Sequence, residues 1–513
     1  MSSFARRVAR ALVGLAVVAG AAATAGCDES TAVPARVQRS PMAKALGIFS
    51  TRTPADPRAQ GRLALEQDAF RRESRFLEGA RPGYLFRATR VEQGELEAGL
   101  WSNEEMYQLG GQLFHVPFTK DVGFGGADLP ALARFHRGRR GGPDAHKCAT
   151  CHWRGGLAGA GDGADNAYLD GDGDSQDSAL ERNPPALHGA GLVELLAQEM
   201  TRDLANLREG LIARARREKA AASVELLSKG VSFGFLDAKA DGSLDTSRLA
   251  AISPDLIVRP FGWKGSFATI RDIVEDSLNI HHGMQSEHFA RTAGAERAGN
   301  GGGDDPDGDG ATREITEGQT SVLSLFVAMQ ETPLSLIPTN TRTFVSDSDF
   351  AMNVAEGRRT FERLGCVECH RPALKLESSV FRLASRAGGK PLVVDLGKEA
   401  AEPRVAAPAD GSGTWVELYS DLRRHDMGPE LRESRPDRGV APEQFLTRPL
   451  WGLARSKPYL HDGRTVTVED AILAHGGEAL PARNGYVFLP ETERLKVRSF
   501  LASLGRARRL VAP

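Results

Sequence analysis

Two five-residue stretches decide how this chain is organised: Cys148–His152 reads Cys-Ala-Thr-Cys-His, and Cys366–His370 reads Cys-Val-Glu-Cys-His. Cys-x-x-Cys-His is the attachment signature of c-type haem. Its two thiols can reach the two vinyl groups of one porphyrin, and the adjacent histidine then lies under the iron as proximal ligand. The sequence therefore predicts two covalently bound haem c groups, with attachment through Cys148, Cys151, Cys366 and Cys369 and iron ligation by His152 and His370.

Two other uses of paired cysteines compete with haem attachment. Zinc ribbons usually separate their two Cys-x-x-Cys pairs by about 15–20 residues, whereas these pairs lie in different halves of the chain. Neither a zinc site nor a redox-active dithiol requires a histidine after each pair. A calcium-dependent structural protein that binds zinc would show no haem absorption.

Length and composition set the class of protein. The 513 residues are 41% hydrophobic and 26% charged, which is enough for two or three domains with their own cores. A formal charge of −2 gives no reason to expect a nucleic-acid partner. No apolar run reaches the length of about 18 residues that a membrane-spanning helix needs, and five cysteines are too few for a disulfide framework.

The N-terminus is typical of an export signal. Three arginines precede the uncharged apolar stretch 11–23, and small residues then lead to Cys27. This ending resembles a bacterial lipobox, which predicts a signal peptide at 1–27 and a lipid anchor on Cys27. The alternative is an ordinary signal peptide that is cleaved nearby. Both place the protein outside the cytoplasm, and 28–100 is expected to form a tether and a peripheral segment.

An internal duplication is visible beyond the two cysteine motifs. The segment that begins at Gly265 matches the segment that begins at Gly463, and both predict a turn followed by a helix start. Apolar residues recur at helical spacing, and strand alternation is rare. We therefore expect an all-α fold of two cytochrome-c-like haem domains, at 101–338 and 339–513, related by internal duplication and carrying loop-rich insertions.

Several motifs together resemble the di-haem oxidoreductase family. They are Asn-Pro-Pro-Ala-Leu-His-Gly at 183–189, Phe-Gly-Trp-Lys at 261–264, His-Asp-Met-Gly at 425–428, Pro-Tyr-Leu-His-Asp-Gly-Arg at 458–464 and Ala-Ile-Leu-Ala-His-Gly-Gly-Glu-Ala at 471–479. That family is similar to the bacterial di-haem cytochrome c peroxidases. The resemblance spans roughly residues 100–508.

The resemblance implies a role for His475. In the peroxidases, a helix after the His-Asp-Gly motif supplies the sixth ligand of the C-terminal haem, usually a methionine. Counting along the helix leads to His475 here. His370 and His475 are thus expected to ligate the second haem and to lower its potential, because methionine ligation raises it. The alternative is a surface histidine at a helix end.

The first haem departs from the peroxidase pattern. The duplicated frame places Ser277 opposite His475, which predicts an open iron face, and the acid/base glutamate of the peroxidases falls on Gly283. His281 and His282 lie nearby and are the candidate catalytic residues, since a histidine can move the peroxide protons. Alternatively His281, His282 or Met284 closes the iron as sixth ligand, or the two histidines are only a polar turn.

The resemblance also assigns residues between the two haems. Trp263 matches the tryptophan that lies between the haems of the peroxidases, where it relays electrons or simply packs. Asn183, Ser456 and Pro458 match residues around the inter-domain calcium. Two Asp-rich loops, 170–174 and 305–309, are each half a match to an EF-hand calcium loop.

These observations predict a periplasmic, lipid-anchored, di-haem c-type oxidoreductase of peroxidase type. Electrons from a small cytochrome c or a cupredoxin would enter at the second haem, pass Trp263, and reduce an oxidant such as hydrogen peroxide at the first haem. The alternative is a non-catalytic di-haem electron-transfer cytochrome. The anchor on Cys27 makes the membrane a partner, and no nucleic-acid partner is expected.

Overall fold

The computed structural model describes residues 83–125, 143–169, 179–297, 305, 307–332, 348–398 and 413–505. All of them lie in one compact unit, Pro54–Pro513. The expected signal peptide 1–27, the anchor Cys27, most of the tether at 28–100 and the acidic loop at 170–174 lie outside the described residues. None of the described helices is both long and apolar enough to span a membrane.

The fold is mixed, and the all-α prediction is wrong. The structure is 40% helical and 15% strand, and the strands form several small antiparallel sheets. Most strands have two to four residues; five of the eleven described strands lie between the two cysteine motifs, and six follow the second motif. Alternation did exist where the strands are longest: β4 (Val231–Ala238) buries every second residue at its two ends.

The N-terminal half is built from helices around one buried helix. Apart from α12 (Glu317–Ala328), these are α5 (Tyr84–Arg87), α6 (Gln93–Glu97), α7 (Asn103–His115), α8 (Cys148–Cys151), α9 (Ala190–Glu218), α10 (Ile270–His282) and α11 (Glu287–Arg297). All twelve residues of α12 are buried, and it packs against α6, α7, α9 and α10. Close packing on α7 requires Gly110, since a Cβ there would lie 2.1 Å from the Val322 carbonyl oxygen.

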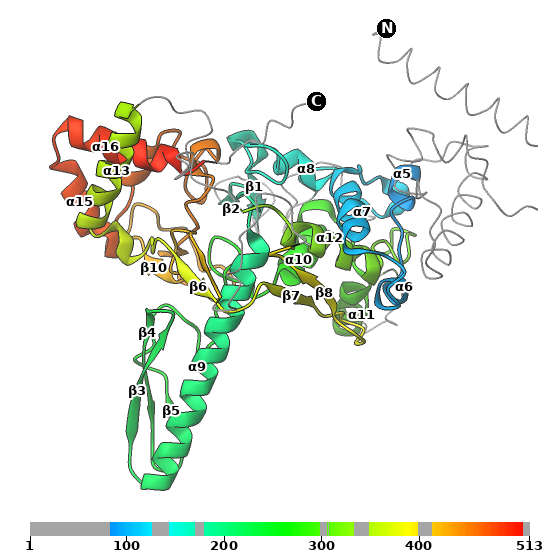
Figure 1. Cartoon of the computed structure of the whole chain (residues 1–513). Helices are drawn as coiled ribbons and strands as arrows, with labels where there is room; N and C mark the ends of the chain where they lie inside the picture. Colours follow the sequence, from blue (N-terminus) through cyan, green and yellow to red (C-terminus); the bar gives the residue numbers. More distant parts are fainter. Residues whose placement is uncertain are drawn as a thin grey trace, which may run out of the picture. The chain divides into compact units, whose positions relative to one another are not determined.

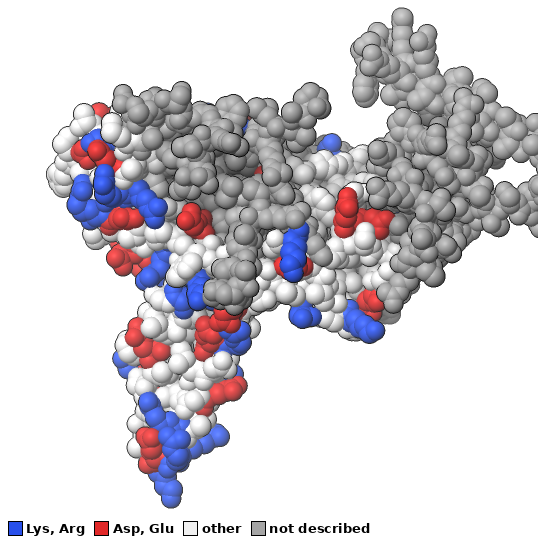
Figure 2. Space-filling view, viewed as in Figure 1, with Lys and Arg blue, Asp and Glu red and all other residues white. Residues whose placement is uncertain are grey.

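Helix α9 and a small sheet form an arm that extends from the rest of the described residues (Figure 1). The helix has 29 residues, and buried positions dominate its first half. The sheet has the order β3-β4-β5, with β3 at Ala222–Ser228 and β5 at Leu244–Asp245. Figure 2 shows lysine and arginine gathered at the end of the arm, where Arg216, Arg217 and Lys219 are exposed.

The C-terminal half combines helices with two-stranded sheets. Its helices are α13 (Ser348–Arg363), α14 (Val468–Leu473), α15 (Leu480–Val487) and α16 (Glu491–Ser503). Its strands pair as β6 (Leu374–Leu376) with β9 (Thr414–Val416), β7 (Val380–Leu383) with β8 (Leu392–Asp395), and β10 (Arg424–Asp426) with β11 (Gln444–Leu446). One further pair, β1 (Ala167–Leu169) with β2 (Leu180–Arg182), belongs to the N-terminal half.

Hydrophobic packing divides into two clusters of unequal size. The smaller cluster lies where α13 packs against α16 and includes Phe361, Tyr486 and Phe500. The larger cluster contains the N-terminal helices, but β6, β7 and β8 of the C-terminal half also contribute residues to it. The packing therefore joins the two halves on either side of residue 338.

The internal duplication is visible in local structure. Phe261 forms a backbone bridge to Phe267, and Tyr459 forms the same bridge to Thr465. A threonine then begins each following helix: the Thr269 side chain accepts a hydrogen bond from the amide of Asp272, and Thr467 accepts one from Asp470. The matched residues are the same distance apart along the chain, so Trp263 and His461 hold equivalent places in the two halves.

Candidate functional site: two cysteine motifs and the cavity between the halves

The second cysteine motif is a tight turn at the end of α13. Gly365 has φ 82°, and the 3-10 turn Cys366–Glu368 follows it directly. The His370 amide donates a hydrogen bond to the Cys366 carbonyl at 3.0 Å. Both thiols are free and partly exposed, so they are available for a covalent bond to a group that lies against the turn.

His370 and His475 face each other with a separation that suits one metal ion. Their ring centres are 6.5 Å apart. An ion held by two imidazole nitrogens at about 2 Å each puts the ring centres ~6.3 Å apart, because each centre lies about 1.2 Å behind its nitrogen. The donor set and its spacing therefore fit a six-coordinate haem iron.

Both rings are oriented by backbone carbonyls. Nδ1 of His370 bonds to the Tyr419 carbonyl at 3.1 Å, and Nδ1 of His475 bonds to the Ala471 carbonyl at 2.7 Å. These bonds place the proton on Nδ1 and leave the Nε2 lone pair for a metal. Burial, and then the neighbouring His475, lowers the pKa of His370 to about 4, and burial also lowers the pKa of His475. Both rings are thus neutral, as ligands must be.

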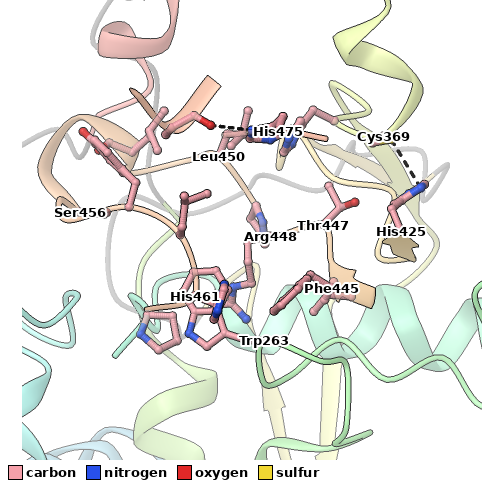
Figure 3. Close-up of a pocket in the computed structure, with 18 of the residues that line it drawn as sticks. Trp263, Cys369, His425, Phe445, Thr447, Arg448, Leu450, Ser456, His461 and His475 are labelled. Atoms are coloured by element: carbon pink, nitrogen blue, oxygen red, sulfur yellow. Dashed lines mark hydrogen bonds between the residues drawn. The ribbon is translucent and has the colours of Figure 1, made fainter. Parts of the chain in front are cut away.

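A largely apolar cavity of about 530 Å³ surrounds this pair. Its volume is in the range typical of pockets for small molecules and cofactors. Figure 3 shows side chains from both halves around it, including Trp263 and His475. The cavity brings together the expected second-haem and inter-haem residues, namely Asn183, Trp263, Cys366, Cys369, His370, Ser456, Pro458 and His475.

The first cysteine motif has the same local geometry. Helix α8 is the single turn Cys148–Cys151, and the His152 amide donates to the Cys148 carbonyl at 3.1 Å. Nδ1 of His152 lies 3.2 Å from the Gly159 carbonyl oxygen and 3.1 Å from that of Pro185. Burial lowers the pKa of His152 to about 4. Its Nε2 is therefore free to ligate iron, as in the second motif.

His281 and His282 end α10 beside the first motif and have different environments. Nε2 of His282 lies 3.6 Å from Sγ of Cys148, and its Nδ1 bonds to the Ala145 carbonyl at 2.7 Å. Burial lowers the pKa of His282 to about 3. Burial also lowers the pKa of His281, but the hydrogen bond of 2.8 Å to Asp144 and the charge of that carboxylate outweigh it, so the net shift is upward.

Glycine is required where α10 ends. Gly283 caps the helix with φ 66°, and a Cβ at this position would lie 2.8 Å from the Cα of Gly125. The glutamate that the peroxidase pattern expects here does not fit this backbone. The histidine pair directly before Gly283 is therefore the titratable group that α10 presents near the first motif, with His282 next to Cys148.

The thiols do not have the properties of the competing interpretations. Burial raises the pKa of Cys148 to about 12 and that of Cys366 to about 11, whereas redox-active dithiols have a lowered thiol pKa. Within the described residues, the group of metal-ligand spacing that contains a motif cysteine is Cys369 with Asp421 and His425, and it includes one thiol. The two motifs do not form a shared four-cysteine zinc site.

Trp263 lies at the junction of the halves. Its indole N–H donates to the Asn183 carbonyl at 2.8 Å. The guanidinium carbon of Arg448 lies 5.6 Å from the centre of the Trp263 rings. The indole is thus fixed by one half and contacts a cation of the other.

The residues expected to bind calcium line the same cavity, but their side chains have protein partners. The Asn183 amide nitrogen donates to the Asp162 carbonyl at 3.1 Å and to the Asn166 side chain at 2.8 Å, and the Ser456 hydroxyl donates to the Gly452 carbonyl at 2.8 Å. In the acidic loop at 305–309, the three aspartates lie within ligand distance of one another. Calcium at either place stays a prediction.

Three contacts at the site were not predicted from the sequence. Asp144 bonds to His281 across 137 residues, His425 is held between Asp421 and Glu478 at 2.8 Å each, and Arg448 stacks near Trp263. A weak signal existed for Asp144, which precedes the first cysteine motif by four residues. The other two contacts involve His425 and Arg448, and their sequence motifs do not predict which residues these side chains contact.

The comparison with protein families identifies the C-terminal half. The family described as "Di-haem oxidoreductase, putative peroxidase" matches residues 339–504. The match confirms the suspected family and includes the second cysteine motif, His475 and the His-Asp-Gly motif. The family description names a di-haem oxidoreductase, and the match covers less than half of the chain.

The comparisons with curated proteins and with solved structures do not assign a family or an activity. No curated protein matches the chain. Among solved structures, hydrazine synthase of Kuenenia stuttgartiensis, pressurised with 20 bar xenon, matches at 14% identity with a TM-score of 0.33. The match covers 79% of this chain and 92% of that chain. A likeness at this score carries no argument about fold or activity.

Proposed function

We propose, from the match of residues 339–504 to the di-haem oxidoreductase family, that the whole chain is an exported di-haem c-type oxidoreductase that reduces a small oxidant such as hydrogen peroxide. Each haem is attached through one cysteine motif. Electrons from a periplasmic cytochrome c or cupredoxin enter at the second motif, and the oxidant reacts at the first.

The observation that carries this proposal is the asymmetry between the two motifs. At the second motif, His370 faces another imidazole at the spacing of a two-histidine iron site. At the first motif, the ring contact of His152 among the described residues is with Phe114, whose centre is 6.2 Å away. A haem bound at the second motif would thus be held by both His370 and His475 and would serve electron transfer, while a haem at the first motif would be held by His152 and would leave room for the oxidant.

The residues beside the first motif can handle the protons of the reaction. Reduction of one hydrogen peroxide to two waters consumes two protons and two electrons, and the electrons would come from the periplasmic donor through the haems. The Asp144 carboxylate keeps His281 protonated to a higher pH, so His281 can donate a proton to a leaving oxygen. His282 is neutral and has its Nε2 toward Cys148, so it serves as an acceptor.

Trp263 is the proposed connection between the two sites, because it lines the cavity of the second motif and is bonded to Asn183 of the N-terminal half. A calcium ion near Asn183, Ser456 and Pro458 would fix the same junction. Export and lipid anchoring on Cys27 complete the proposal, since haem attachment of this type takes place outside the cytoplasm.

A non-catalytic electron-transfer cytochrome is the second candidate. The observation in its favour is that α10 ends with two imidazoles beside Cys148, and buried Met284 follows two residues later. If one of these side chains closes the first iron, both irons are six-coordinate and no oxidant binds.

The deciding experiment is a spectrum of purified holoprotein before and after peroxide, with haem content measured by mass. C148S/C151S and C366S/C369S should each lose the mass of one haem. The reduced wild type should be oxidised by peroxide, and H281A or H282A should slow turnover ~100-fold or more, as expected for general acid–base residues.

The control for the histidine variants is H288A, which removes a histidine of the neighbouring helix α11. It should leave turnover within a factor of two of wild type, or about 0.4 kcal/mol in activation free energy. Low-spin signals from both haems that do not respond to peroxide or cyanide would establish the electron-transfer cytochrome instead. Absence of haem absorption would exclude both.

A further inference from the structure

Arg448 is a half-buried cation, and no carboxylate among the described residues forms an ion pair with its guanidinium. It lines the cavity of the second motif, and burial alone lowers its pKa to about 10. Within the described part of the chain, no carboxylate or carbonyl lies within hydrogen-bonding distance of its guanidinium. Its guanidinium carbon lies over the face of Trp263, 5.6 Å from the centre of the rings.

Four fully buried cations near the junction are paired with carboxylates. Each of them has one or more carboxylates within 3.1 Å: Arg182, Lys264, Arg271 and His425. An uncompensated charge away from water is strongly unfavourable. A group that fills the cavity would take the Arg448 guanidinium out of water, and an anion on that group would offset the cost.

The position of Arg448 indicates which anion that is. Cys366, Cys369, His370 and His475 line the same cavity, and in the view of Figure 3 Arg448 lies between Trp263 and His475. A haem attached to this motif carries two propionate carboxylates on one edge. A guanidinium binds a carboxylate through two parallel hydrogen bonds.

We infer that Arg448 binds a propionate of the haem held by the second motif and fixes that edge of the porphyrin beside Trp263. This inference rests on the proposed function. Arg448 is a positioning residue, which acts on the potential of the haem and on its distance from the indole. The N-terminal half lacks the counterpart, because Pro184 occupies the matching place in Asn183-Pro184-Pro185.

Removal of this charge should change the potential of one haem. A cation beside a propionate disfavours the ferric state, so R448Q should lower the potential of the haem ligated by two histidines. We expect the equilibrium constant for its reduction to fall tenfold or more, which is about 59 mV for a one-electron couple. R448K keeps the charge and should restore most of the difference. The other haem should shift less than twofold.

The experiment uses the full-length holoprotein and no peroxide. Midpoint potentials are measured by spectroelectrochemical titration, and the propionate carboxylate bands by redox infrared difference spectroscopy. R483Q is the matched control, because Arg483 lines the same cavity but bonds to Asn484 and to the Leu473 carbonyl. It removes the same charge, should shift the potential less than R448Q does, and should leave the carboxylate bands unchanged.

The outcomes separate the inference from the proposed function. Two attached haems, with R448Q shifted no more than R483Q and the carboxylate bands unaltered, would overturn the inference alone. A wild-type chain without haem at the second motif would overturn the proposed function as well. If R448Q does not fold, altered carboxylate bands in folded R448K support the inference, and bands identical to wild type in R448K refute it.

Discussion

Replacement of His475 tests whether the second iron has two imidazole ligands. The ring centres of His370 and His475 are 6.5 Å apart, close to the ~6.3 Å expected for two imidazoles that hold one metal ion. H475A should therefore leave His370 as the remaining ligand of one iron in two. Half of the total ferric haem signal should change from low spin to high spin.

The methionine variant gives the sign and magnitude of the potential change. Axial ligands set haem potentials over a range of about 0.8 V, and methionine ligation raises them relative to histidine. We expect H475M to increase the equilibrium constant for reduction of the second haem by about 100- to 1000-fold. At about 59 mV per tenfold change, its potential rises by ~120–180 mV. Spectroelectrochemical titration measures this shift.

H115A is the matched control for both variants. The His115 ring bonds to the carbonyl of Gly111, four residues earlier, at 2.7 Å, as His475 bonds to Ala471. Its replacement removes the same hydrogen bond from an exposed helix end and should leave both spectra as in wild type. A low-spin spectrum of H475A that equals that of wild type, with both haems attached, would refute the assignment of His475 as ligand.

Three further predictions concern other parts of the chain. D144N should move the alkaline limb of the pH–rate profile for peroxide reduction to lower pH, because the carboxylate that raises the pKa of His281 is lost. An unmoved alkaline limb would exclude His281 as the proton donor. R271M should lower the free energy of unfolding by about 3–5 kcal/mol in denaturant titration, since it leaves the buried Glu317 carboxylate of α12 without its cation. Exposed R202M should cost about 1 kcal/mol or less, and equal losses would contradict this explanation. C27S should release the protein from the membrane fraction and abolish labelling by a radioactive fatty acid; unchanged labelling would show that the anchor is elsewhere.

Local patterns predicted the parts of the fold that depend on near neighbours in the chain. The cysteine motifs, the turns at Gly265 and Gly463, and the helix starts that follow these turns are predicted from spacing over a few residues. Counting along the helix from the His-Asp-Gly motif also led to His475, which the structure places opposite His370. Ligation of iron by this pair stays a prediction.

The sequence was less informative where distant segments meet. The bond between Asp144 and His281 and the stacking of Arg448 near Trp263 join residues with no fixed interval between them. The strands were not predicted for another reason. Most have three or four residues, which is too short for alternation to stand out, and their pairing partners follow after insertions.

The contribution of β6, β7 and β8 to the larger hydrophobic cluster has a practical consequence. Leu374, Phe381 and Val394 are at most 1% exposed within a cluster otherwise built largely by the N-terminal helices. A separate fragment that starts at residue 339 would expose these apolar side chains to water. Expression of the family-matched segment by itself should accordingly yield aggregates, and biochemical work on either haem requires the chain to be produced in one piece.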